Sequence, residues 1–216
     1  VNSWYPNQLK AVSNYDTLHA VNAYGVWRLP IGRGMRFGSQ MNPVLDAILG
    51  GWQISGIYRQ SSALPATTST GSVWPTNWQL SNPAVPNGNP PPAVNVSKNG
   101  ALANGTVYPS LYATVDDAKA SLAAYRQSFP GEYGLRNNIR TNGNFNIDTM
   151  LAKTFRMPYK EGHMVQIRWE TFNMTNSAIL NGQNASLSMT ATSTWGRINS
   201  TRGTPRQMQF AIRYVF

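Results

Sequence analysis

The side chains that could do chemistry in this chain are few and scattered. The two histidines, His19 and His163, have no metal-binding neighbour two or four positions after them, so we expect structural polar roles for them. Asp116 and Asp117 could form a calcium-binding or acid–base pair, but carboxylates at the start of a helix explain this pattern better. Cysteine is absent, as are a nucleophile elbow, a phosphate-binding loop and a dinucleotide fingerprint. The sequence predicts no catalytic residue, no metal site and no cofactor, and hence a protein that is not an enzyme.

Four charged residues have the spacing of one strand face. Asp148, Arg168, Glu170 and Arg213 each alternate with apolar neighbours at a period of two. We expect Asp148 and Glu170 to lie on adjacent strands near Arg168 and to form an inward-facing network of ion pairs. Contact with a solute that passes along this face is the alternative.

Aromatic side chains also occur in a long polar stretch in the middle of the chain. Trp74, Trp78, Tyr108 and Tyr112 are candidates for ligand contact, because aromatic rings on loops can stack on sugars or pack against a partner. They can equally form a small core within the loop itself, together with Tyr125, and we favour that interpretation.

The composition narrows the class of protein that must position these residues. Of the 216 residues, 41% are hydrophobic and only 12% are charged, about half of the charged fraction of an ordinary soluble domain. Asn, Ser, Thr, Gln and Gly supply the polarity, which favours β-structure with long polar loops. No apolar run approaches the roughly 18 residues of a membrane helix, whereas a barrel strand crosses with about 9–11 alternating residues.

The formal net charge is +10, from 18 Lys and Arg against 8 Asp and Glu. This excess favours anionic partners such as lipid head groups or acidic glycans. The arginines stand singly, without the basic runs of nucleic-acid-binding arms, so we expect no nucleic-acid partner. Because no signal-peptide pattern follows Val1, we expect either that a signal was removed or that the sequence begins inside a larger protein.

Period-two alternation predicts about five long strands. They cover residues 19–29, 52 to about 60, 145–156, 165–170 and 206–216. Residues 43–49 should form one or two helical turns capped by Gly50 and Gly51, and residues 114–125 a second helix. The stretch 66–143 is otherwise irregular, and we expect it to be one long extracellular loop.

The last strand has the pattern of a membrane-crossing strand. Met208, Phe210, Ile212, Tyr214 and Phe216 fall on one side, and polar residues or alanine fall on the other. One apolar face, one polar face and an aromatic end are what a transmembrane β-barrel needs.

Consecutive strands of such a barrel alternate in direction. If Phe216 is periplasmic, the short links 30–51 and 157–162 are periplasmic too, and the two long connections lie outside. Five aromatic residues then gather at the periplasmic strand ends as a membrane-interface girdle. They are Trp27, Trp52, Phe155, Tyr214 and Phe216.

Several short motifs, in this order, resemble the Oar-like TonB-dependent outer-membrane receptors. The segments are Tyr24-Gly25-Val26-Trp27-Arg28-Leu29-Pro30-Ile31-Gly32-Arg33-Gly34, Leu49-Gly50-Gly51-Trp52-Gln53-Ile54-Ser55-Gly56-Ile57-Tyr58, Ser62-Ala63-Leu64-Pro65 with Ala in place of the family's Gly, Asn146-Ile147-Asp148 with Lys153 and Phe155, Arg168-Trp169-Glu170-Thr171-Phe172-Asn173, Gly196-Arg197-Ile198 and Thr201-Arg202-Gly203-Thr204-Pro205-Arg206-Gln207. Asp16-Thr17-Leu18-His19 departs from the family's Asp-x-Arg-His, so any role of that arginine is absent here.

The resemblance implies that residues 1–216 are the C-terminal strands of a large barrel, of about 22 strands in outer-membrane transporters. It places the plug domain and the segment that contacts TonB in an N-terminal region beyond this chain. It also implies that the last strand carries the signal read by the barrel-assembly machinery. The fold class expected is therefore all-β: an antiparallel transmembrane β-barrel segment with long extracellular loops.

The function expected on this basis is ligand binding and uptake across the outer membrane of a Gram-negative cell. The partners expected are outer-membrane lipid, the barrel-assembly machinery, the TonB system through the plug, and an extracellular ligand such as a glycan or another large nutrient. One alternative is a secreted all-β adhesin or glycan-binding module, whose apolar faces would meet in a closed two-sheet core. Another is a small complete barrel of about eight strands, with extra strands from 67–127 and 177–195.

Overall fold

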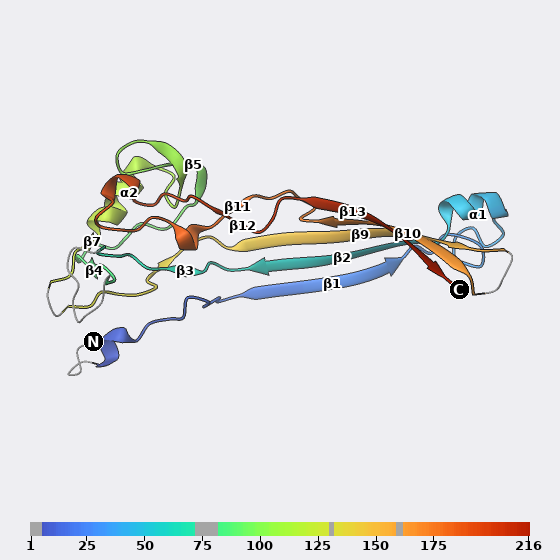
Figure 1. Ribbon diagram of the computed structural model, residues 1–216, viewed down its shortest axis with the longest axis horizontal. Helices are drawn as coiled ribbons and strands as arrows, with labels where there is room; N and C mark the ends of the chain where they lie inside the picture. Colours follow the sequence, from blue (N-terminus) through green and yellow to red (C-terminus); the bar gives the residue numbers. More distant parts are fainter. Residues whose placement is uncertain (1–5, 72–81, 130–131, 159–161) are drawn as a thin grey trace. The chain divides into compact units, whose positions relative to one another are not determined.

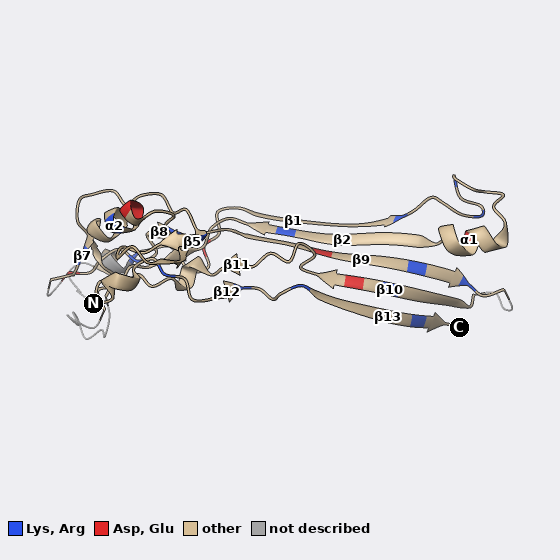
Figure 2. Cartoon of the chain, turned by 90° about the horizontal axis from the view of Figure 1, so that it is seen from above, with Lys and Arg blue, Asp and Glu red and all other residues tan. Residues whose placement is uncertain are grey.

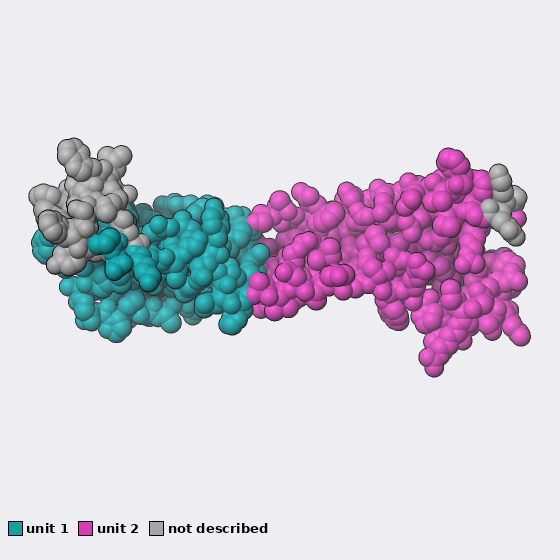
Figure 3. Space-filling view, turned by 90° about the horizontal axis from the view of Figure 1, so that it is seen from below, with its two compact units in different colours: residues 1–19, 61–144, 179–202 teal, residues 20–60, 145–178, 203–216 magenta. Residues whose placement is uncertain are grey.

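The chain folds mainly into β-strands. The computed structural model describes residues 6–71, 82–129, 132–158 and 162–216. These divide into two compact units, which Figure 3 shows in different colours. Unit 1 comprises residues 1–19, 61–144 and 179–202, and unit 2 comprises residues 20–60, 145–178 and 203–216. Each unit is therefore built from chain segments that are far apart in the sequence.

Five long strands form one antiparallel sheet within the described part of the chain (Figure 1). In spatial order they are β1 (Ala20–Arg28), β2 (Trp52–Ser61), β9 (Asn144–Arg156), β10 (Met164–Phe172) and β13 (Gln207–Val215). All five strands predicted from the alternation are confirmed, with shifts of a residue or two at their ends. β1 and β13 are the two edges of this sheet.

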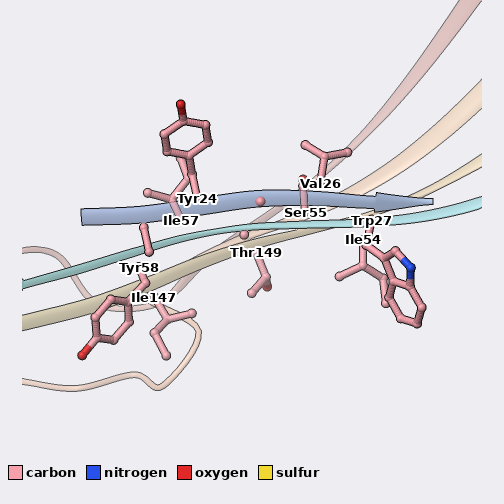
Figure 4. A pocket seen from close by; sticks show the side chains of 12 residues that line it. Tyr24, Val26, Trp27, Ile54, Ser55, Ile57, Tyr58, Ile147 and Thr149 are labelled. Atoms are coloured by element: carbon pink, nitrogen blue, oxygen red, sulfur yellow. The ribbon is translucent and has the colours of Figure 1, made fainter. Parts of the chain in front are cut away.

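The register of the strands sorts the side chains onto two faces. Trp169 of β10 lies opposite Phe210 of β13, and the next residue, Glu170, lies opposite Gln209. Because neighbouring residues point to opposite faces, apolar and polar side chains separate across the sheet. The alternation between faces is also visible at β1 and β2 (Figure 4), where Trp27, Ile54, Tyr58, Ile147 and Thr149 project to one side and Tyr24, Val26, Ser55 and Ile57 to the other.

Helix α1 (Pro43–Leu49) forms the link between β1 and β2. The side chain of Asn42 accepts a hydrogen bond from Leu45 N at 2.8 Å, and Pro43 fits the first turn, where its missing N–H is not needed. Gly50 caps the C-terminus by donating its N–H to Asp46 O at 2.8 Å. The predicted helix and its glycine cap are both confirmed.

Gly51 makes the close turn from α1 into β2. Its φ is +69°, and a Cβ atom there would lie 2.4 Å from the carbonyl oxygen of Thr154 on β9. Both the left-handed conformation and the contact exclude a side chain. This glycine therefore sets the start of β2 against the end of β9.

Unit 1 contains short elements rather than long strands. Its strands pair as β3 with β8, β4 with β7, β5 with β6, and β11 with β12. The elements of this unit are η1 (Pro6–Leu9), β3 (Pro65–Ala66), β4 (Val85–Pro86), β5 (Ser97–Ala101), β6 (Val107–Ser110), α2 (Val115–Ala123), β7 (Tyr125–Arg126), β8 (Ile139–Arg140), β11 (Ile179–Leu180), η2 (Gly182–Asn184), η3 (Thr192–Thr194) and β12 (Thr201–Arg202). The helix expected over 114–125 is confirmed as α2, with Asp116 and Asp117 in its first turn.

A hydrophobic core holds unit 1 together. Its largest members are the fully buried Trp195, Tyr112, Leu111 and Ile198. The described residues of 66–143 are therefore not an irregular loop: they share a core with residues 179–202. In the described ranges, 67–127 and 177–195 add no strand to the five-stranded sheet, so the expectation of a small complete barrel is wrong.

Candidate membrane-facing and lumen-facing surfaces

The apolar face of the sheet in unit 2 is open. Ile212 is 76% exposed, Phe210 75% and Trp27 61%, although each is large and apolar. Soluble monomers rarely expose a continuous apolar surface of this kind. The secreted module considered above would bury these side chains in a two-sheet core, so that expectation is wrong for the described residues.

The five predicted girdle residues lie at one end of the sheet. Trp52 begins β2, the β10 register sets Val165 opposite both Phe155 and Tyr214, and the rings of Tyr214 and Phe216 stack at 6.0 Å. A backbone hydrogen bond of 3.0 Å from Leu29 to Trp52 brings the end of β1, with Trp27, to the same edge. The contact of these rings with a membrane stays a prediction.

Lys153 is the one charged residue in the apolar row of β9, near the strand's end, where a lysine side chain can extend to the membrane surface. The structure instead buries it to 6% exposure. Its ammonium donates to the carbonyl oxygens of Ile48, at 3.3 Å, and Gly50, and it lies 5.2 Å from the ring centroids of Trp52 and Phe155. Lys153 therefore satisfies the last carbonyl groups of α1, which have no partner within the helix.

The opposite face carries all four predicted polar residues: Asp148, Arg168 and Glu170 take part in two ion pairs, and Arg213 lies opposite Gln166. Asp148 Oδ2 lies 2.9 Å from Arg59 Nη1, and Asp148 Oδ1 accepts from Asn146 and from the backbone N–H of Asn173. Glu170 pairs with Arg168 at 3.5 Å and accepts from Gln209. The expected ion pairs are present, and the partner of Asp148 is Arg59, a residue that was not named from the sequence. That this face lines a lumen stays a prediction.

Arg59 was not predicted as a member of the polar face, although the alternation of β2 indicates it. It belongs to the row of β2 that alternates with Trp52, Ile54 and Tyr58, so it had to share a face with Asp148. The cross-strand partner depends on the register between β2 and β9, and the two strands are separated by more than eighty residues of chain. Alternation fixes the face, whereas register fixes the partner.

Arginines outnumber carboxylates on this polar face. Asp148 near the start of β9 and Glu170 near the end of β10 lie toward the end of the sheet opposite the aromatic rings. Figure 2 shows acidic residues in red on both strands. The arginines of this face are Arg28, Arg59, Arg156, Arg168 and Arg213. A wall with this excess of positive charge attracts anionic solutes.

The candidate ligand-contact aromatics have different surroundings. Tyr112 is only 1% exposed, so it belongs to the core of unit 1 and its assignment as a ligand contact is wrong. Tyr108 is half-buried, and the guanidinium of Arg197 covers its ring at 4.2 Å from the centroid. Trp74 and Trp78 lie outside the described residues.

Trp195 is a core residue that was not identified from the sequence. It is fully buried, its indole N–H donates to Ser121 Oγ at 3.2 Å, and the same hydroxyl lies 2.5 Å from Tyr112 Oη. Burial raises the pKa of Tyr112, and it raises the pKa of Tyr125 to about 12. Both hydroxyls are therefore neutral hydrogen-bonding groups at physiological pH.

The ion pair of Arg126 and Glu132 in unit 1 gives a prediction about pH. The guanidinium makes two contacts with the carboxylate, of 2.7 and 2.9 Å, and lowers the pKa of Glu132 from 4.5 to about 2. Since this pKa is depressed on folding, the stabilisation is complete above 4.5 and is lost as the pH falls toward 2. We expect Glu132→Gln to remove this part of the pH dependence in denaturant unfolding of the full-length protein.

Arg126→Gln is the matched variant, because it breaks the same pair from the other side. Both variants should converge with the native protein as the pH falls through this window. A stability difference that stays constant over the window would contradict the role of the pair. The carboxylate side chain is 37% exposed, so solvent screening keeps the effect small.

His163 has a polar side-chain contact, since its Nδ1 lies 2.5 Å from Tyr214 Oη. At His19 the backbone N–H, not the ring, donates to Ser62 Oγ, so a polar role of that side chain stays a prediction. Among the described residues, no cluster of three or more His, Cys, Asp or Glu side chains could hold a metal ion. No helix in the same part of the chain is long and apolar enough to cross a membrane.

Comparison with known proteins gives one match. A family model described as "Outer membrane beta barrel domain" matches residues 1–209. No curated protein and no solved structure matches the chain significantly. The matched range takes in both units and nearly all of the five-stranded sheet.

Proposed function

The chain belongs to the family of outer membrane beta barrel domains, and from this premise we propose that it forms wall strands and outer loops of a TonB-dependent receptor. The receptor binds an extracellular ligand and takes it across the outer membrane. Unit 2 supplies barrel wall, and unit 1 supplies the ligand-contacting outer part. No step of this function changes a covalent bond of the ligand.

The two-faced sheet carries this proposal. Its apolar side presents Phe210 and Ile212 to lipid, and its other side presents the ion pairs of Asp148 and Glu170 to a water-filled lumen. The free edges of β1 and β13 then pair with the remaining strands of the barrel, because a barrel has no open edge. The aromatic rings at one end of the sheet form the periplasmic girdle.

The arrangement of the connections supports an outer role for unit 1. The segments between β2 and β9 and between β10 and β13 both contribute to unit 1, and both leave the sheet at the end opposite the aromatic rings. Long connections on one side and short ones on the other are typical of outer-membrane barrels. The ordered motifs shared with the Oar-like receptors support the coupling to TonB.

The partners follow from these assignments. Outer-membrane lipid surrounds the apolar face, the barrel-assembly machinery engages the last strand, and TonB acts through an N-terminal plug of the full-length receptor. A glycan or another large nutrient is the ligand class, and the arginine excess of the polar face favours an anionic one.

Uptake by whole cells tests the coupling to TonB. Cells that produce the full-length protein would be given a pool of fluorescent anionic oligosaccharides, in one host with a working TonB system and in one without it. We expect surface binding in both hosts but accumulation only in the first. Equal accumulation in the two hosts would contradict energised transport, and absence of binding in both would contradict this ligand class.

A further inference from the structure

Helix α1 is fixed to the apolar side of the sheet at the aromatic end. The indole N–H of Trp52 donates to Ile48 O at 2.9 Å, and Lys153 donates to the carbonyl oxygens of Ile48 and Gly50. Trp52 and Lys153 both belong to the apolar face. The C-terminal end of α1 is therefore held by side chains from the surface that faces lipid.

A second attachment fixes the rotation of α1 about its axis. Asp46 points back toward the preceding turn, where its Oδ1 accepts from the backbone N–H of Arg33 at 2.7 Å. A Cβ atom at Gly32 would lie 2.7 Å from this oxygen, so the turn and the helix are in close contact. With Asp46 turned inward, the opposite side of the helix must point away from the chain.

The outward side of α1 is apolar. Val44 is 71% exposed, Ile48 59%, and Leu45 and Leu49 46% each. Residues four apart lie on the same face of a helix, so these two pairs form one stripe. In the described part of the chain, α1 contacts its surroundings through Asp46 and through its C-terminal carbonyl groups. The side chains of the stripe are therefore left exposed.

We propose that α1 is an interfacial membrane anchor whose apolar stripe inserts among lipid acyl chains. The leaflet is the one around the aromatic end of the sheet, which the proposed function makes periplasmic. The Ile48 end of the stripe is hydrogen-bonded to Trp52 of the apolar face, so the stripe adjoins the surface that the proposed function turns toward lipid. The turn before it adds a cation and a ring, with Arg36 5.5 Å from the centroid of Phe37, a composition typical of segments at the head-group boundary.

The anchor has a mechanical consequence for the barrel wall. Lys153 is buried against two rings and two carbonyl groups, so α1 cannot leave the sheet without exposing an ammonium to the apolar phase. Lipid contact at α1 therefore stabilises the start of β2 and the end of β9 together. This inference rests on the proposed orientation of the apolar face toward lipid.

Lipid-attached quenchers test the anchor in the full-length protein, reconstituted in phosphatidylcholine–phosphatidylglycerol vesicles. The 216 residues contain no cysteine, so Ile48→Cys provides a defined site here for an environment-sensitive fluorophore. Ala47→Cys is the matched control, since Ala47 lies on the same helix but faces a hollow lined by Arg33 and Asp46. Ile212→Cys, on β13, reports on the lipid-facing strands.

We expect the labels at positions 48 and 212 to have a blue-shifted emission, as in an apolar environment. Lipids with a doxyl group on the acyl chain should quench this emission. The Ala47 label should respond instead to aqueous iodide. Quenching at Ile212 but not at Ile48 would overturn the anchor alone, whereas quenching at neither would overturn the proposed lipid-facing sheet. A label at Ile48 that is shielded from both iodide and doxyl lipid would mean that protein covers α1, which also overturns the anchor. Each variant is used only if it keeps the electrophoretic mobility of the folded barrel.

Discussion

Replacing Ile212 by arginine is expected to destabilise the folded barrel by about 2–4 kcal/mol, the cost of a cation on the lipid face near the bilayer midplane. Ile212 lies in β13 opposite Ile167 and is 76% exposed. In water, an arginine at so exposed a site would be nearly neutral, because it would bury no charge. The prediction therefore depends on lipid rather than on any contact within the chain.

The matched variant is Gln209→Arg on the same strand. Gln209 lies on the other face, opposite Glu170, so the new guanidinium gains a carboxylate partner in the proposed lumen. Equilibrium unfolding of the full-length protein in phospholipid vesicles would measure both variants against the native protein. Equal destabilisation by the two arginines, or none by Ile212→Arg, would mean that the apolar face does not meet lipid.

The long strands could be predicted from sequence because their signal is local. An alternation such as Met208, Phe210 and Ile212 is complete within a few residues, and it assigns both the strand and its faces. Gly50 and Gly51 likewise mark the end of α1 by their own chemistry. Features that a few neighbouring residues determine can therefore be predicted from those residues alone.

The pairings between distant segments were not predictable in the same way. Trp195 meets Tyr112 through Ser121, which lies 74 residues before Trp195, and no period in the sequence links them. The burial of Lys153 could not be predicted, because its partners are backbone carbonyl groups. Every residue has such a group, so the residue types do not indicate the contact. In both cases tertiary packing determines the environment of the side chain, and single-sequence patterns do not contain it.

The polar face lies between these two cases. Its membership followed from alternation, so Asp148 and Glu170 were placed correctly on one side of the sheet. The ion-pair partners depended on how far each strand slides along its neighbour, which sequence alone left open. Arg59 is the partner of Asp148 because of the pairing between β2 and β9, which the sequence does not reveal.

Truncation of Trp195 to alanine is expected to have the largest effect on unit 1. The side chain is fully buried, packs beside Tyr125 at 6.1 Å between ring centroids, and donates to Ser121. Removing a buried tryptophan costs about 3–5 kcal/mol, a large share of the roughly 5–15 kcal/mol that stabilises a typical domain. We therefore expect unit 1 to lose its ordered core.

Trypsin cleavage of the full-length protein in vesicles would measure this loss, since Lys119 in α2 and Arg197 beside Trp195 are cleavage sites within the unit. Both sites should become rapidly cleaved in Trp195→Ala. The uncleaved protein should keep the electrophoretic mobility of the folded barrel, because the sheet belongs to the other compact unit. Val107→Ala is the control, since Val107 is 68% exposed in the same unit and its truncation should cost at most about 0.5 kcal/mol. Unchanged protection of both sites in Trp195→Ala would contradict a core centred on this residue. Loss of oligosaccharide binding in the same variant, with binding kept in Val107→Ala, would tie the folded core of unit 1 to recognition of the ligand.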